Sequence, residues 1–230
     1  MAVGSAFVIY IVGAVAVDLV WQGIAPGTFT SEGLTVGIVS YQFLALGTAI
    51  SVVLLVRTRG ATLGAIGFRF PGWEAILMSA LVVIPVFVGV ALIYSLFSTF
   101  DPGYHLHGNA QELLSGTTGH LTVTEKIALF IFAAVEAPIT EETLFRGILF
   151  QGVRQLFSRW VPFPVAVASA AVVSGALFGF LHFEPQTLPI LIFLGIVLAS
   201  VFQFTRSLYG SMTVHAIVNA IAVISLIQSS

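Results

Sequence analysis

The chain has few charged residues and no cysteine. Only 8% of its 230 residues are charged and 58% are hydrophobic, whereas soluble domains average about 25% charged residues. A chain this apolar has too little polar surface to face water, so lipid is expected to be its main solvent. The absence of cysteine excludes disulfides and thiol chemistry. The net charge of −2, without any basic run, gives no sign of nucleic-acid binding.

The N-terminus lacks the basic residues that precede the apolar run of a secretory signal peptide. Residues 1–22 contain a small-residue stretch, AVAVD, that is similar to a cleavage site, but no Lys or Arg stands before the run. We therefore expect a retained transmembrane helix rather than a cleaved leader.

Long apolar runs dominate the rest of the chain. A helix of about 20 apolar residues crosses a bilayer, and in lipid a helix pairs all of its own backbone polar groups. The sequence therefore predicts an all-α, polytopic transmembrane helical bundle of about seven spans. These spans are about 3–22, 34–56, 75–98, 125–152, 162–182, 187–205 and 208–227. An eighth helix, either re-entrant or lying on the surface, is left open within 101–122.

Basic residues gather in alternate loops. Three arginines lie between the second and third runs, two between the fourth and fifth, and one between the sixth and seventh. The other loops hold no Lys or Arg except Lys126, at the edge of the fourth run. By the positive-inside rule, the arginine-bearing loops face the cytoplasm. We therefore expect an integral protein of the plasma membrane with a cytoplasmic N-terminus.

The longest polar segment, 101–122, contains His105, His107 and His120. These side chains could bind a metal ion. However, a His-x-His pair with no third ligand nearby is weak evidence for a metal site. A solvated loop is the expected structure here.

Four charged residues stand within the fourth run, where a charge at a helix centre costs about 2.5–3.5 kcal/mol. They are Glu136, Glu141, Glu142 and Arg146. Glu142 and Arg146 are four residues apart and are expected to pair on one helix face, whereas Glu141 points about 100° away. Pro138 precedes them and tends to kink the helix. An ion pair that locks helix packing would explain Glu142 and Arg146, but not Glu141.

Two later runs each carry a histidine at helical spacing from another notable residue. Phe178 and His182 share a face of the fifth run, and His215 and Asn219 share a face of the seventh. A single buried histidine is more often a core residue than a ligand or a base. Two histidines on separate spans, together with an asparagine and two glutamates, favour a shared active site.

Gly175 and Gly179 form a small-xxx-small pair on the fifth run. Such a pair predicts that another helix packs closely against this face.

These residue types fit the attack of water on a carbonyl group. A carboxylate can act as general base on water, and an imidazole can share that water or bind a metal ion. An amide and a histidine N–H can stabilise an oxyanion. The His-Glu-x-x-His signature, the Gly-x-Ser-x-Gly elbow and any Walker-type loop are absent.

Three motifs together resemble a known family. They are Glu141-Glu142-x-x-x-Arg146, Phe178-x-x-x-His182 and His215-x-x-x-Asn219. In order and approximate separation they resemble the motifs of the CAAX-protease and bacteriocin-processing family (CPBP, or Abi domain), over about residues 123–225. Residues 1–100 match only a generic membrane lead-in. We accordingly divide the chain into 1–122, N-terminal transmembrane helices with an outer loop, and 123–230, a CPBP-like catalytic core, within one integrated membrane domain.

The resemblance implies an intramembrane endopeptidase that acts on a membrane-associated peptide or a prenylated protein, with membrane lipid as its other partner. It assigns water activation to Glu141 and His182, support to Glu142 and Arg146, and oxyanion stabilisation to His215 and Asn219. It leaves the cofactor open. The enzyme would use either no metal or a zinc ion held by Glu141, His182 and His215.

The alternative is a non-catalytic membrane protein, either an immunity or scaffold factor or a small transporter with a polar centre. A transporter is expected to show broken helices in paired repeats. Only the Pro138 break is visible in the sequence, without a matching half.

The depths of the candidate residues do not agree when they are counted along straight helices. At about 1.5 Å per residue from the inner arginines, Glu141 lies roughly 20 Å deep, His215 roughly 14 Å and His182 roughly 30 Å. Helix tilt, the Pro138 kink, or a start of the fifth span nearer Val165 would close the gap. We favour the late start.

Overall fold

The computed structural model describes residues 52–54, 56–58, 60, 62–104, 122–182 and 184–229. Within these ranges every regular element is helical, which confirms the all-α prediction for this part of the chain. The predicted span 3–22, most of the span 34–56 and the three loop histidines (His105, His107 and His120) lie outside the described residues. The same holds for the extra helix left open within 101–122, apart from the first four residues and the last one of that range.

The helices follow one another with short connections. They are η1, a 3-10 helix (Leu63–Ile66), α3 (Trp73–Leu81), α4 (Val83–Phe100), α6 (Val123–Ile131), η2, a π-helix (Phe132–Glu136), α7 (Ala137–Glu142), η3, a π-helix (Thr143–Phe150), α8 (Gln151–Phe157), α9 (Phe163–Phe180), α10 (Leu188–Thr205) and α11 (Leu208–Ser229).

Four helical stretches among the described residues are long and apolar enough to cross a membrane. They are Trp73–Phe100, Phe163–Phe180, Leu188–Thr205 and Leu208–Gln228. These stretches agree with four of the predicted runs to within a few residues. The run predicted at 125–152 folds instead as five successive segments, α6 to α8. The chain is therefore an integral membrane protein with several helical spans.

Prolines and one capping box set several helix ends. Pro85 has no N–H to donate to the carbonyl of Leu81, where α3 ends. Prolines stand in the first turn of α9 and of α10, where their missing N–H is not needed. At the start of α6, the Thr122 hydroxyl accepts from the backbone N–H of Glu125, whose carboxylate accepts from the N–H of Thr122.

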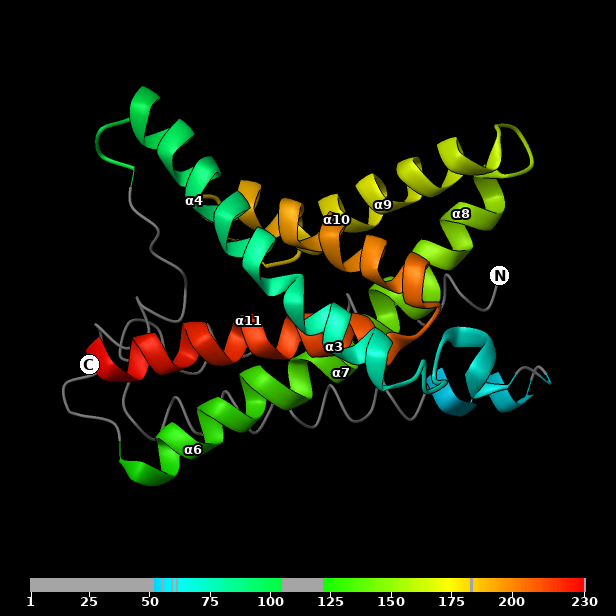
Figure 1. The fold of residues 1–230 in the computed structure, drawn as a ribbon, viewed down its shortest axis with the longest axis horizontal. Coiled ribbons are helices and arrows are strands. Elements are labelled where there is room, and N and C mark those ends of the chain that lie inside the picture. The colour runs from blue at the N-terminus through cyan, green and yellow to red at the C-terminus, as the bar shows by residue number, and fades with distance from the viewer. Residues whose placement is uncertain are drawn as a thin grey trace, which may run out of the picture.

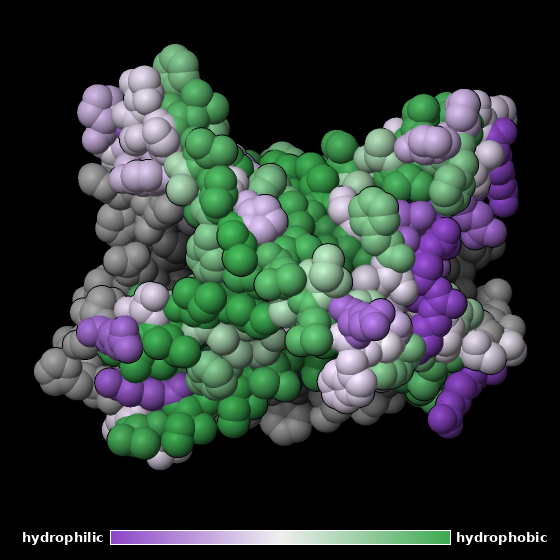
Figure 2. All heavy atoms as spheres, in the orientation of Figure 1, coloured by the Kyte–Doolittle hydropathy of each residue, from purple (hydrophilic) through white to green (hydrophobic). Residues whose placement is uncertain are grey.

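The helices pack around α11 (Figure 1). α11 contacts η2 and α7 on one side, and it also contacts α3 and α10. α9 and α10 lie side by side, and α4 diverges from them. Figure 2 shows hydrophobic side chains over the middle of the visible face and most hydrophilic ones toward the two ends. This distribution fits a bundle whose middle faces lipid.

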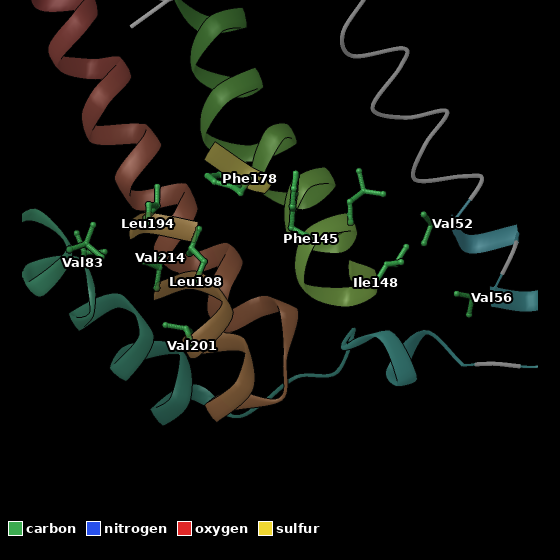
Figure 3. Close-up of a cluster of buried hydrophobic side chains, with 12 residues drawn as sticks. Val52, Val56, Val83, Phe145, Ile148, Phe178, Leu194, Leu198, Val201 and Val214 are labelled. Carbon is green, nitrogen blue, oxygen red and sulfur yellow. The ribbon is translucent and has the colours of Figure 1, made fainter. Parts of the chain in front are cut away.

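A buried apolar cluster holds η3 between the spanning helices (Figure 3). Phe145 and Ile148 of η3 pack with Phe178 of α9, Leu198 of α10 and Val214 of α11. The rings of Phe145 and Phe178 meet edge to face, with centroids 5.3 Å apart. Because these side chains are almost fully buried, they fix the orientation of the segment that carries Arg146.

α9 and α10 approach each other closely through glycines. A Cβ atom added to Gly195 would lie 2.6 Å from the Cα atom of Gly175, and one added to Gly175 would lie 2.9 Å from the carbonyl oxygen of Ile192. Gly179 faces the backbone nitrogen of Ile192 in the same way, at 3.1 Å. The close packing expected of Gly175 and Gly179 is confirmed.

We expect Gly195→Ala to destabilise the protein, because its methyl group meets backbone that can move only if the two helices separate. Overpacking of this kind costs about 1–3 kcal/mol, so the unfolding midpoint in detergent should fall by several degrees. Gly64→Ala is the control, since its nearest neighbour would be the Thr62 hydroxyl at 3.7 Å, an ordinary contact. Equal midpoints for the two variants would contradict the close approach.

Candidate active site

Two π-helical segments, η2 and η3, flank the short helix α7. In η2 the N–H of Ala137 donates to the carbonyl of Phe132, five residues earlier. The next residue, Pro138, has no N–H, so it cannot continue this pattern to the carbonyl of Ala133. Asn219 of α11 supplies the missing donor, with Nδ2 at 2.8 Å from that carbonyl oxygen. The break expected at Pro138 is thus a π-helical turn, a feature frequent at functional sites.

Glu142 and Arg146 form the buried ion pair that their spacing predicted. Nη1 of Arg146 lies 2.8 Å from Oε1 of Glu142, and both side chains are 0% exposed. Nη2 donates to the carbonyl of Gly195 on α10, at 3.1 Å. The guanidinium also stands 4.7 Å from the centre of the Phe178 ring. The pair therefore ties η3 to both α9 and α10.

Both candidate histidines use Nδ1 for a structural contact. Nδ1 of His215 lies 2.9 Å from Oε1 of Glu142, and Nδ1 of His182 lies 2.6 Å from the carbonyl oxygen of Phe178. A carbonyl or an ionised carboxylate only accepts, so Nδ1 carries the proton in each ring. In the neutral form of each imidazole, Nε2 is then left with a free lone pair.

Glu141 meets both of these Nε2 atoms. Its Oε2 lies 3.8 Å from Nε2 of His215 and 4.0 Å from Nε2 of His182. This Oε2 is buried and has no hydrogen-bond partner. The structure thus brings Glu141, Glu142, Arg146, His182 and His215 to one centre. Asn219 joins it from one turn beyond His215 on α11, through its bond to the carbonyl of Ala133.

The mismatch in counted depth disappears in the structure. α9 begins at Phe163, so the late start that we favoured, nearer Val165, is wrong by about two residues. His182 lies in the turn just after α9 ends, yet it reaches Glu141. Figure 1 shows α8 and α9 diverging from the turn that joins them, so equal residue counts along these helices do not give equal depths.

The gap between Glu141 and the two histidines suits a water molecule. Separations of 3.8 and 4.0 Å are too long for direct hydrogen bonds. Three acceptor atoms face one another there, so the group between them must be a donor, and a water has two hydrogens to give.

The same three side chains do not form a zinc site in this arrangement. Among the described residues, no group of three or more His, Cys, Asp or Glu side chains has the geometry to hold a metal ion. The mechanism below is therefore derived from the chain's own groups.

Sequence reasoning missed the backbone carbonyls that hold the site together. The carbonyl of Gly195 accepts from Arg146, and that of Ala133 accepts from Asn219. Every residue has a carbonyl, so residue type gives no signal for either contact. The missing N–H of Pro138 was the one available clue to the exposed carbonyl of Ala133.

Arg146→Ala is expected to destabilise the protein strongly, because it leaves the Glu142 carboxylate buried without its counter-ion. Breaking a buried pair costs about 3–5 kcal/mol. The thermal midpoint in detergent should drop well below that of Arg159→Ala, which removes an arginine exposed at the surface. If the two variants melt together, the pair does not support the fold.

Asn219→Ala is expected to leave the Ala133 carbonyl unsatisfied, at a cost of about 1–3 kcal/mol. Adding Pro138→Ala should recover part of this loss, since alanine restores an N–H at the position from which η2 lacks one. Thermal midpoints of the two single variants and the double variant measure the coupling. Additive losses would show that Asn219 does not compensate for Pro138.

The comparisons with known proteins point in the same direction as the geometry. Residues 123–221 match the model of a family described as type II CAAX prenyl endopeptidase Rce1-like. No curated protein and no solved structure matches the chain. The matched segment runs from the first residue of α6 into α11 and contains all six candidate site residues. The family predicted from the three motifs is confirmed, and through residues 123–221 the chain belongs to the Rce1-like family of CAAX-type proteases.

Proposed function

We propose that the chain is an intramembrane endopeptidase that hydrolyses a peptide bond near the C-terminus of a prenylated, membrane-associated protein or peptide. The observation that carries this proposal is the buried Oε2 of Glu141, which has no hydrogen-bond partner and faces the Nε2 atoms of His182 and His215. A carboxylate held in this way has no evident structural task. It is placed to take a proton from a water bound between the three side chains.

The first step is the attack of that water. Its oxygen forms a bond to the carbon of the scissile carbonyl while one of its protons passes to Glu141. The carbonyl π bond opens, and the negative charge moves to the former carbonyl oxygen. His182 orients the water by accepting its second hydrogen at Nε2, because Nδ1 is already bound to the carbonyl of Phe178.

The second step is the collapse of the tetrahedral intermediate. The carbon–nitrogen bond breaks as Glu141 returns its proton to the departing amine. One product then carries a new carboxylate and the other a new amine. Glu141 is left ionised and ready for the next water.

Asn219 is placed to stabilise the oxyanion of this intermediate. One of its two amide hydrogens is engaged by the carbonyl of Ala133, which fixes the side chain and leaves the second hydrogen available. A fixed donor of this kind needs no reorganisation when the charge develops. Nε2 of His215 lies on the same side of Glu142, where it can exchange a proton with the reacting group.

Glu142 and Arg146 act as positioning residues in this scheme. Glu142 holds the ring of His215 through Nδ1, and Arg146 neutralises Glu142. Neither group touches the gap between Glu141 and the two histidines in the contacts that the structure shows. Their contribution is therefore to fix the direction in which Nε2 of His215 points.

The family match supports a membrane-associated substrate. A prenyl chain would keep the substrate in the bilayer beside the site. By the positive-inside rule, the arginine-bearing loops face the cytoplasm of a cell membrane, which would place the N-terminus inside.

The test is cleavage of an internally quenched, farnesylated peptide that ends in a CAAX sequence, by the purified protein in detergent. Glu141→Gln should lower the rate by about 10²–10⁴-fold, the usual contribution of a general base, without changing the thermal midpoint. Glu74→Gln, an exposed position on α3, is the matched control and should cleave like the wild type.

Two results would count against the proposal. Turnover retained by Glu141→Gln would remove Glu141 from the mechanism. No cleavage by the folded wild type, with or without the farnesyl group on the peptide, would favour the non-catalytic alternative.

A further inference from the structure

A second polar site lies far along the chain fold from Glu141, at the end of the bundle where the arginines gather. Here η1, α8 and the turn between α10 and α11 surround a cavity of about 210 Å³. Arg69, Arg154 and Arg206 line this cavity together with Gln151, and no acidic residue lines it. Figure 2 shows hydrophilic side chains gathered at this end, which Figure 1 identifies by the α10–α11 turn.

The three guanidinium groups lack acidic counter-ions. Among the described residues, the ion pairs involve only Arg146, His182 and His215 on the basic side. Burial, and secondly the nearby charge of Arg206, lower the pKa of Arg154, although an arginine stays protonated at neutral pH. Three like charges around one cavity repel one another, so an anion in the cavity would stabilise this end of the protein.

The arginines are held in place rather than free to separate. Nε of Arg69 donates to the carbonyl of Arg206 at 2.6 Å, and the Ser207 hydroxyl donates to the carbonyl of Arg69 at 2.6 Å. Nη1 of Arg154 donates to the side chain of Gln203 at 2.6 Å. These contacts link three separate segments of the chain and keep the charges together before any ligand arrives.

Arg206 also adopts a backbone conformation that non-glycine residues seldom use. Its φ of 53° lies in the left-handed region, where it ends α10. This conformation costs about 1–2 kcal/mol for a residue with a side chain. Glycine would end the helix without that cost, so the presence of arginine here indicates a task for its side chain.

We propose that Arg69, Arg154 and Arg206 form a binding site for a phosphate group. The size of the cavity fits, since a water takes up about 30 Å³ in the liquid and the cavity holds several times that volume. Guanidinium groups match the oxygens of phosphate with paired donors. Basic pockets at the cytoplasmic ends of spanning helices are suited to lipid head groups.

The surroundings favour a membrane lipid as the source of the phosphate. Trp73 begins α3, Trp160 lies in the α8–α9 turn, and Phe204 lies at the end of α10, all at this end of the bundle and all exposed. Tryptophan concentrates at the level of lipid head groups. The cavity therefore lies at the depth where an anionic head group would stand. This inference does not depend on the proposed peptidase activity.

The test compares lipid binding by the wild type with that by Arg69→Gln, Arg206→Gln and the double variant. Native mass spectrometry and lipid-induced shifts of the thermal midpoint would be followed during titration with phosphatidylglycerol. Each substitution should weaken binding about fivefold, the usual effect of one basic residue at an anionic surface, and the double variant about 25-fold. Arg159→Gln, at the same end but outside the cavity, is the matched control and should bind like the wild type.

A second arm replaces the lipid with inorganic phosphate. If phosphate alone raises the midpoint of the wild type but not of the double variant, the site takes phosphate from solution rather than from lipid. If the double variant and Arg159→Gln respond alike in both arms, the phosphate site is overturned. The midpoint of each variant without ligand shows that it is folded, so loss of binding cannot come from unfolding.

Discussion

The contact between Glu142 and Arg146 is the constraint on which the rest of the centre depends. Neither side chain is exposed, so each charge can be balanced only by protein groups. Arg146 completes its shell with the carbonyl of Gly195 on α10, and Glu142 completes its own with His215 on α11. The need to balance two buried charges thus fixes three elements against one another. The glycine contact between α9 and α10 serves the same arrangement, because it brings the Gly195 carbonyl within reach.

Adjacent glutamates acquire different roles from this arrangement. Glu142 is consumed by its partners, whereas Glu141, about 100° further round the helix, has only Nε2 atoms before it at distances that leave room for water. Neighbouring carboxylates that serve separate tasks because their surroundings differ are a recurring pattern in hydrolytic sites. The difference lies in geometry rather than in residue type, since both side chains are the same.

Much of this could be predicted from sequence, because it follows from helical periodicity. Spacings of four residues gave the Glu142–Arg146 pair and the shared faces of His182 and His215, and apolar length gave four spans that the structure bears out. Depth could not be counted, since α8 and α9 diverge and two turns of the charged segment are π-helical. The acceptors on Ala133 and Gly195 could not be predicted either, because a carbonyl has the same chemistry at every position. The roles of the six site residues stay predictions.

The two groups of arginines show how depth changes the way a charge is compensated. Arg146 lies where no ion from solution can reach it, so its partner had to be built into the same helix, one turn away. Arg69, Arg154 and Arg206 lie at the end of the bundle, where mobile anions and lipid head groups are at hand, and the described part of the chain supplies them with no carboxylate. An internal counter-ion at that end would cancel the charge that draws a ligand. The same residue type is therefore structural in the middle of the bundle and available for binding at its edge.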